Sequence, residues 1–252
     1  MTAPLSAVMP VYNEEGAIEA AVREVQEHVL DAVPGAELIV VDDGSRDATG
    51  AILDRLARTD GRLQVIHQPN GGHGAALRTG LARAAGHFVF LLDSDRQIPL
   101  AAFDALWQAA RSRDGAFGIR LARHDPRLRL VLTRVVRTAL RLGFGVRLAD
   151  ANVPFKIVRR TAWVAAESTI PAGTLAPSLF LAVFMRQRGY DVVEVAVPHR
   201  ARATGTISIR RWKLLRFCMR PRPARCLPRP SPRHLPYPAP GRRRRTLTRP
   251  RL

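Results

Sequence analysis

Short apolar runs alternate with helix-like patterns through the first half of the sequence. Residues 38–41 (Leu-Ile-Val-Val) and 88–92 (Phe-Val-Phe-Leu-Leu) contain no polar side chain, which is typical of parallel strands that are covered on both faces. Ile18, Val22 and Val25 recur every three or four residues, which predicts the apolar face of an amphipathic helix. This alternation favours an α/β fold with a doubly wound, mostly parallel sheet and helices on both faces.

The same patterns give bounds for the other elements. Strands are expected at 5–11, 63–66, 116–119 and 191–197, and helices at 51–58, 74–85, 99–107 and 127–142. Residues 191–197 alternate apolar and polar side chains, which is typical of a strand with one solvated face. Ligands of open α/β sheets bind at the carboxyl ends of the strands, so functional side chains are expected directly after these strands.

Two carboxylates follow the apolar run 88–92, in the triplet Asp93-Ser94-Asp95. Carboxylates this close repel one another, and a divalent cation such as Mg²⁺ or Mn²⁺ relieves the repulsion because it prefers oxygen ligands. An extended chain would point Asp93 and Asp95 to opposite faces, so both serve one site only if the chain turns here. The triplet indicates a metal site, with an ordinary polar loop as the alternative.

Residues 42–45 (Asp-Asp-Gly-Ser) follow the run 38–41 in the same way. One interpretation is a carboxylate that accepts hydrogen bonds from a nucleobase or a ribose. The other is a turn that leads into a helix with Ser45 or Asp47 as its N-cap. The two interpretations are compatible.

Two more polar clusters begin where strands are expected to end. Residues 10–15 (Pro-Val-Tyr-Asn-Glu-Glu) provide Tyr12 and Glu14 as candidate nucleoside contacts, or Asn13 as a helix cap. Residues 70–74 (Asn-Gly-Gly-His-Gly) precede a helix, where glycine-rich backbone can hold an anion. Their spacing matches neither a Walker loop nor a dinucleotide fingerprint, so they mainly indicate a tight turn.

The motifs P-x-Y-N-E-E, V-D-D-G-S, N-G-G-H-G and D-S-D-R-Q, in this order and spacing, resemble those of inverting family 2 GT-A glycosyltransferases. The polyprenyl-phosphate sugar transferases, the dolichol-phosphate mannose synthase group, are the more similar members. The resemblance extends over about residues 4–217. It implies a GT-A fold that transfers a hexose from a UDP- or GDP-sugar to a polyprenyl phosphate, with Mg²⁺ or Mn²⁺ at the donor diphosphate.

The resemblance also implies roles for individual residues. Those that would line the nucleoside pocket are Pro10, Tyr12, Glu14 and Asp43. Those at the metal would be Asp93 and Asp95, with Ser94 beside them. Those that would act on the transferred group and the phosphates are Asp93, Asp95, Gln97, Arg120 and Arg202. Arg202 lies in a run, residues 200–208, that is similar to an R-x-x-G-x-S loop, although Ile207 stands where the family has serine.

The second half of the sequence helps to identify the class of acceptor. Enzymes of this family that glycosylate a hydroxyl carry an acidic pair as general base, whereas residues 171–178 contain no carboxylate. A phosphate acceptor is already anionic and needs no base, which favours a lipid phosphate. Transfer to a hydroxyl of a glycan or small molecule, with Asp150 or Glu167 as base, is the first alternative. A non-catalytic binding module is the second.

Arginines form a stripe on one side of the expected helix 127–142, opposite an apolar side. Such a helix can lie on a membrane surface, or it can present an ordinary solvated face. Trp163, Trp212 and Phe217 could anchor the chain at an interface or belong to the core. No signal peptide and no apolar run of spanning length are apparent. The expected location is therefore cytoplasmic, peripheral at the inner face of the membrane.

Charge divides the chain in two. The net charge is +19, and the segment from Arg220 onward contributes eleven arginines and nine prolines but no acidic residue. Such a composition cannot bury a core, so we expect a GT-A domain at 1–218 and a disordered Pro/Arg-rich tail at 219–252. Nucleic-acid binding by the tail is the less favoured interpretation. The two cysteines, Cys218 and Cys226, do not suggest a disulfide framework.

Overall fold

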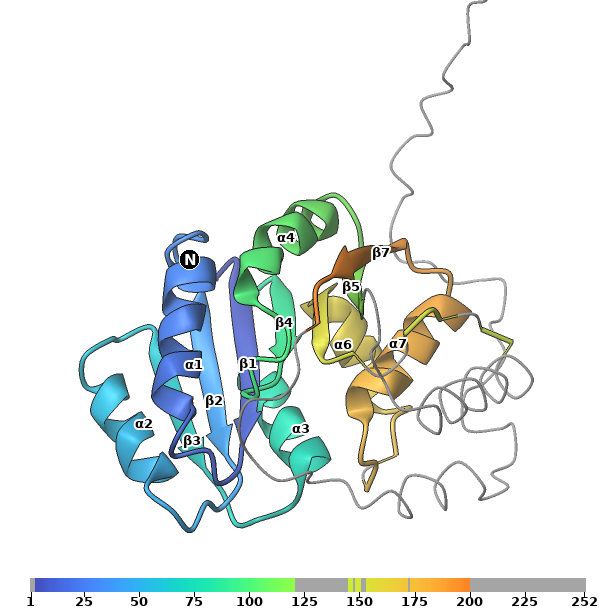
Figure 1. Cartoon of the computed structure of the whole chain (residues 1–252). Helices are drawn as coiled ribbons and strands as arrows, with labels where there is room; N and C mark the ends of the chain where they lie inside the picture. The colour runs from blue at the N-terminus through green and yellow to red at the C-terminus, as the bar shows by residue number, and fades with distance from the viewer. Residues whose placement is uncertain (1–2, 121–144, 147, 151–152, 172, 200–252) are drawn as a thin grey trace, which may run out of the picture.

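The computed structural model describes residues 3–120, 145–146, 148–150, 153–171 and 173–199. These residues form one seven-stranded sheet with helices on both faces (Figure 1). The first half contains β1 (Leu5–Val11), α1 (Ile18–Val25), a π-helical turn (Gln26–Leu30), β2 (Glu37–Asp42), α2 (Thr49–Ala57), β3 (Leu63–His67), α3 (His73–Arg83) and β4 (Phe88–Leu92). The second half contains a 3-10 turn (Leu100–Ala102), α4 (Phe103–Arg111), β5 (Gly115–Arg120), β6 (Phe155–Arg159), α6 (Arg160–Glu167), α7 (Pro177–Gln187) and β7 (Val192–Val197).

The strands lie in the order β3-β2-β1-β4-β6-β5-β7. All neighbours are parallel except where β6 is inserted antiparallel between β4 and β5. In this arrangement Leu92, the last residue of β4, is the register partner of Phe155, the first residue of β6. The carboxyl ends of the six parallel strands therefore share one edge of the sheet, and β6 begins at that edge.

Side chains of the strands alternate between two hydrophobic clusters, one on each face. Ala7 and Met9 of β1 belong to the cluster beneath α1, α2 and α4. Val8, between them, belongs to the cluster beneath α3, α6 and α7. Burial of each large apolar side chain contributes about 1.5–3 kcal/mol, so the two clusters fix the helices to both faces of the sheet.

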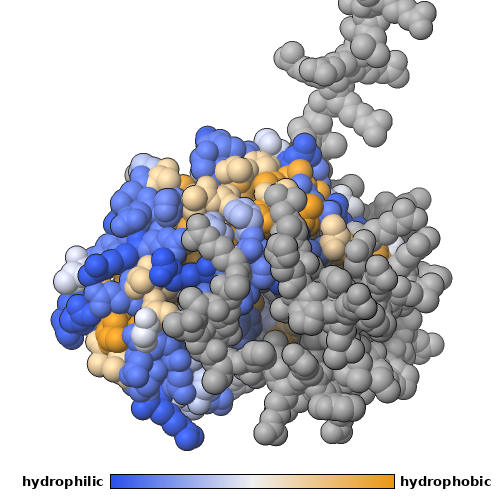
Figure 2. Space-filling view, in the orientation of Figure 1, coloured by the Kyte–Doolittle hydropathy of each residue, from blue (hydrophilic) through white to orange (hydrophobic). Residues whose placement is uncertain are grey.

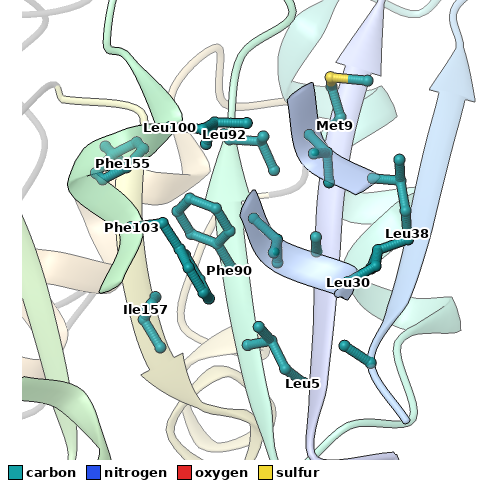
Figure 3. Close-up of a cluster of buried hydrophobic side chains, with 14 of the residues drawn as sticks. Leu5, Met9, Leu30, Leu38, Phe90, Leu92, Leu100, Phe103, Phe155 and Ile157 are labelled. Carbon is teal, nitrogen blue, oxygen red and sulfur yellow. The ribbon is translucent and has the colours of Figure 1, made fainter. Parts of the chain in front are cut away.

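Aromatic residues join the two halves of the sheet in the first cluster (Figure 3). The ring centroid of Phe90 on β4 lies 5.0 Å from that of Phe155 on β6, in an edge-to-face arrangement. It also lies 5.3 Å from the ring of Phe103 on α4. Such aromatic pairs contribute about 0.5–1.5 kcal/mol beyond their burial, and they hold β6 against β4 near the edge where functional side chains gather.

Glycines allow α3 to lie close to its neighbours. A Cβ on Gly80 would be 2.4 Å from Val8 Cγ1 of β1, and a Cβ on Gly74 would be 2.2 Å from the carbonyl oxygen of Thr174. Neither separation is possible between real atoms. The first glycine therefore permits close packing of α3 on the sheet, and the second brings the segment around Thr174 against the start of α3.

The predicted mostly parallel α/β architecture is confirmed, and each strand predicted in the first half is present. The antiparallel strand β6 and the helices α6 and α7 were not predicted. The expected helix 127–142 and the boundary at 218/219 lie outside the described residues.

None of the helices in the described part combines the length and apolar character that crossing a bilayer requires. Figure 2 shows hydrophilic side chains around α1 and α2, and apolar ones near α4 and β7.

Candidate active site

The polar motifs of five strands meet at the edge formed by the parallel carboxyl ends. Val11 of β1 is the register partner of Asp42 of β2, and Arg120 of β5 is the partner of Val197 of β7. The acidic triplet follows β4 at the same edge. This placement follows from the parallel pairing, because every motif lies at the carboxyl end of its strand or shortly after it.

The chain turns immediately after β4, at Ser94 and Asp95. The turn brings Asp93 and Asp95 into the lining of one pocket, which an extended chain would not do. The carboxylate oxygen Oδ1 of Asp95 accepts a hydrogen bond from the backbone amide of Gln97 at 3.2 Å. Ser94 is buried between the two aspartates. The turn anticipated from the sequence is present.

The pocket also contains side chains from distant strands. Gln97, Arg120 and His199 line it together with the two aspartates, and Phe155 contributes to its apolar part. The side chains of Gln97 and His199 are in contact, with 3.3 Å between Oε1 and Nε2. The structure thus brings together Asp93, Asp95, Gln97 and Arg120, which the sequence analysis selected separately. Arg202 lies outside the described residues.

Arg120 forms a two-bond ion pair with Asp150. Its Nε and Nη2 atoms donate to the two oxygens of Asp150 at 2.8 and 3.1 Å. Both side chains are largely buried, with exposed fractions of 12% and 7%. A bidentate pair of this kind fixes the plane of the guanidinium group. Asp150, a candidate base in the sequence analysis, is therefore a partner of Arg120 in this structure.

Lys156 of β6 is fully buried beneath this ion pair. Its ammonium donates a hydrogen bond to the carbonyl oxygen of Val153 and lies 5.8 Å from the ring centroid of Phe117. Burial lowers the pKa of Lys156 to about 8, and the carboxylates of Asp150 and Asp93 act in the opposite direction. The sequence analysis missed Lys156 because it missed β6. A lysine inside the apolar run 153–158 was the available signal.

The loops after β1 and β2 are joined by hydrogen bonds. The backbone amide of Asn13 donates to Ser45 Oγ at 2.9 Å, and the amide of Arg46 donates to Asn13 Oδ1 at 2.8 Å. Asn13 is therefore not the cap of α1, whose N-cap is Ala17. Ser45 is likewise not a cap of α2; Asp47 accepts from the amide of Thr49 instead. The N-cap of α2 is Ala48, so neither Ser45 nor Asp47 occupies the cap position, although Asp47 Oδ1 accepts from the first amide of the helix at 3.0 Å.

Asp43 organises the glycine-rich turn. Its Oδ1 accepts from Gln68 Nε2 at 2.7 Å and from the amide of Gly71 at 2.8 Å. Its Oδ2 accepts from the amide of Gly72 at 2.7 Å. Tyr12, by contrast, is 39% exposed. Asp43 thus fixes the conformation of the glycine-rich turn, a structural role that the sequence analysis did not predict.

His73 also contacts the acidic turn, from the first residue of α3. Its Nε2 lies 2.9 Å from Asp93 Oδ1. Burial opposes the charged imidazolium, but the carboxylates of Asp93, Asp43 and Asp95 outweigh burial, so the pKa of His73 is raised. The imidazole therefore belongs to the surroundings of the acidic pair, and its place in the N-G-G-H-G motif was the only signal for it.

A comparison with known families matches residues 6–161 to the family described as glycosyl transferase family 2. The chain belongs to glycosyl transferase family 2. It is 31% identical over 235 residues to an undecaprenyl-phosphate 4-deoxy-4-formamido-L-arabinose transferase of Pseudomonas aeruginosa. That alignment covers 88% of this glycosyltransferase and 67% of the relative. The resemblance drawn from the motifs is confirmed.

Solved structures show the same fold in other glycosyltransferases. Glucosyl-3-phosphoglycerate synthase from Mycobacterium tuberculosis, in complex with Mn²⁺, uridine diphosphate and glucosyl-3-phosphoglycerate, aligns with a TM-score of 0.63 at 22% identity. The alignment covers 86% of this chain and 76% of that one. A mannosyltransferase from Pyrobaculum calidifontis, with GDP-Man and Mn²⁺, has a TM-score of 0.56 at 20% identity, over 81% and 59% of the two chains. The expected GT-A fold is confirmed.

The donor set of this family 2 glycosyltransferase suits a hard divalent cation. Asp93 and Asp95 provide carboxylate oxygens from a single turn, and Mg²⁺ typically takes one or two carboxylates together with substrate phosphates and water. Among the described residues, no three His, Cys, Asp or Glu side chains are arranged as a metal cluster. The residues present fit a cation that is bound jointly with a phosphorylated ligand.

Proposed function

We propose that this glycosyltransferase moves a hexose, with inversion, from a UDP- or GDP-sugar to a polyprenyl phosphate. The observation that carries the proposal is the convergence of Asp93, Asp95, Gln97 and Arg120 on one pocket at the carboxyl edge of the sheet. A pair of carboxylates beside an arginine suits a diphosphate with a divalent cation. The printed name of the Pseudomonas aeruginosa relative, which specifies undecaprenyl phosphate, supports the acceptor.

On the donor side, we assign the nucleoside to the loops after β1 and β2. The exposed ring of Tyr12 offers a stacking surface, Glu14 and Asp43 belong to the same loops, and Pro10 lies at the end of β1. Asp93 and Asp95 would hold Mg²⁺ or Mn²⁺, with Ser94 between them. When bound, the cation neutralises charge on the departing diphosphate. Arg120 would add a fixed positive charge there, because Asp150 holds its guanidinium in one orientation.

On the acceptor side, a phosphate oxygen would attack the anomeric carbon. The bond between that carbon and the diphosphate oxygen breaks, and the nucleoside diphosphate leaves with the electron pair. No proton is removed from the nucleophile, which agrees with residues 171–178 containing no carboxylate. Of the two candidate bases, Asp150 is paired with Arg120, and Glu167 is a partly exposed carboxylate 3.9 Å from Arg78 on α3.

Thermal unfolding with UDP, GDP and Mn²⁺, added separately and together, tests the donor site. A nucleotide at about 100 times its Kd should raise the free energy of unfolding by about 2.7 kcal/mol, and we expect this only with metal and one of the two nucleotides. Asp95→Ala should abolish the shift. Asp104→Ala is the matched control, because Asp104 is an exposed carboxylate on α4 that bonds only locally to Gln108. An unchanged shift in Asp95→Ala would contradict the assignment.

Sugar transfer to a polyprenyl phosphate and to the corresponding polyprenol distinguishes the two acceptor classes. We expect labelled product with the phosphate alone. Product with the alcohol, lost in Asp150→Asn, would instead establish transfer to a hydroxyl with Asp150 as general base. Family membership favours either enzyme over the non-catalytic module.

A further inference from the structure

Glu24 of α1 bonds to the acidic loop at two points. Its Oε2 accepts from Arg96 Nε at 2.8 Å, and its Oε1 accepts from the backbone amide of Leu100 at 3.1 Å. These two contacts lie on either side of Gln97 and bracket the segment that follows Asp95. One carboxylate thus ties the loop between β4 and α4 to a helix more than sixty residues earlier in the chain.

The loop needs such a restraint because its backbone is strained at Arg96. The φ angle of Arg96 is +53°, in the left-handed region that residues with a Cβ rarely adopt. Such conformations cost about 1–3 kcal/mol and persist only where surrounding contacts enforce them. Arg96 follows Asp95 directly, so relaxation of its backbone would change the direction of the Asp95 carboxylate.

Glu24 is a rigid point of attachment. Its neighbours Ala21 and Val25 are buried in the core between α1 and the sheet, and the Glu24 side chain is only 17% exposed. Together with Asp93, Asp95 and Gln97, Glu24 lines the same pocket. A charge-assisted hydrogen bond in this partly enclosed position is stronger than one on an open surface.

We propose that Glu24 is a positioning residue, which holds residues 93–100 so that Asp93 and Asp95 face one ligand. The consequence for metal and nucleotide rests on the proposed function, whereas the restraint on the loop does not. Groups that orient metal ligands typically change metal affinity by about 10- to 100-fold when removed. Glu24 acts through the loop backbone, so an effect of about tenfold is expected.

Glu19 is the matched control. It lies on the same helix and also bonds to two arginines, Arg23 and Arg55, each at 2.6 Å. Its contacts are to α1 and α2, and it does not reach the acidic loop. Glu24→Ala and Glu19→Ala therefore remove the same side chain and a similar number of bonds from the same helix.

The experiment measures two quantities in the full chain. Hydrogen exchange without ligands is expected to become faster across residues 93–100 in Glu24→Ala and to stay unchanged there in Glu19→Ala, since the Leu100 amide loses its acceptor only in the former. The Mn²⁺ concentration for half-maximal nucleotide-dependent thermal stabilisation is expected to rise about tenfold in Glu24→Ala. Glu24→Gln should be intermediate in both, because it keeps an oxygen for Leu100 but loses the charge facing Arg96.

Each outcome is decisive for one part of the inference. Unchanged exchange in residues 93–100 would overturn the restraint itself. Faster exchange with unchanged Mn²⁺ dependence would overturn its role in positioning the carboxylates. If the wild type shows no metal-dependent nucleotide binding, the proposed function fails, and hydrogen exchange alone then decides whether Glu24 holds the loop.

Discussion

Arg120, Asp150 and Lys156 form a largely buried charged group, and its Arg120 lines the same pocket as the acidic pair. Asp150 neutralises Arg120 directly, and the ammonium of Lys156 adds a second positive charge that has no exposed surface. Burying a charge is unfavourable unless other groups compensate for it. Burial of this group therefore lowers the free energy of unfolding. The same positive charge would attract an anionic ligand in the pocket.

Lys156 gives a pH dependence of stability with a definite sign. Its folded pKa of about 8 lies below the ordinary value of 10.5, so between these values the unfolded chain binds more protons and stability rises with pH. Relative to Lys156→Met, the wild type should gain about 2 kcal/mol between pH 7 and pH 9.5, at about 1.4 kcal/mol per pKa unit. Urea unfolding of both proteins at each pH measures this difference.

Because all other groups titrate alike in the two proteins, their contributions cancel in this comparison. A difference in unfolding free energy that is the same at both pH values would show that Lys156 keeps an ordinary pKa. That result would remove the argument that this ammonium is poorly solvated.

At the scale of elements, α3 packs closely against β1 at Gly80. Gly80→Ala would place a Cβ 2.4 Å from Val8 Cγ1, and overpacking of this kind typically costs about 1–3 kcal/mol. We expect a loss of that size in chemical denaturation. Adding Val8→Ala should recover part of it, because the new methyl group would fill the space that Val8 leaves.

Gly61→Ala serves as the control for this prediction. Gly61 precedes β3, its φ is not in the left-handed region, and a Cβ there would meet no atom within 4 Å. It should change stability by less than about 0.5 kcal/mol. An equal loss in Gly61→Ala and Gly80→Ala would indicate a general effect of alanine and not a collision with Val8.

The elements also show what the sequence could and could not predict. Fully apolar runs such as 38–41 and 88–92 identify central parallel strands, because strands covered on both faces exclude polar residues. β6 reads Phe-Lys-Ile-Val-Arg and follows no helix-like pattern, so periodicity gave no sign of it. Its antiparallel insertion depends on contacts with β4 and β5, which are distant in sequence.

The candidate site likewise contains residues that the sequence could predict and residues that it could not. Motif residues that follow strands directly, such as Asp93, Asp95 and Arg120, were found because strand ends converge. The contacts of Glu24 and Asp150 could not be predicted from the sequence. Their partners, Arg96 and Arg120, are distant in the chain and come close only when it folds. The alternative in which Asn13 caps a helix is wrong, because its side chain accepts from the amide of Arg46, on another loop.

The whole molecule carries a net charge of +19, which is the basis for the expectation from the sequence that it contacts an anionic membrane. Lys and Arg near such a surface contribute about 1 kcal/mol each, and salt screens the attraction. More protein should sediment with vesicles containing anionic lipid at 50 mM salt than at 500 mM, because the Debye length shortens about threefold between these two concentrations. Vesicles of zwitterionic lipid are the control, and equal binding to both would contradict an electrostatic origin.

The order of strands has a consequence for synthesis on the ribosome. β1 to β4 pair with one another, so the strands that precede the nucleoside motifs and the acidic turn can associate as soon as they emerge. β5 pairs only with β6 and β7, both of which follow it in the chain. β6 bridges β4 and β5, so Arg120 can reach its place only after residue 159 has been made. The nascent chain can therefore bring the loops of Tyr12, Asp43 and the acidic pair together first, and the cationic side chain of Arg120 joins them later.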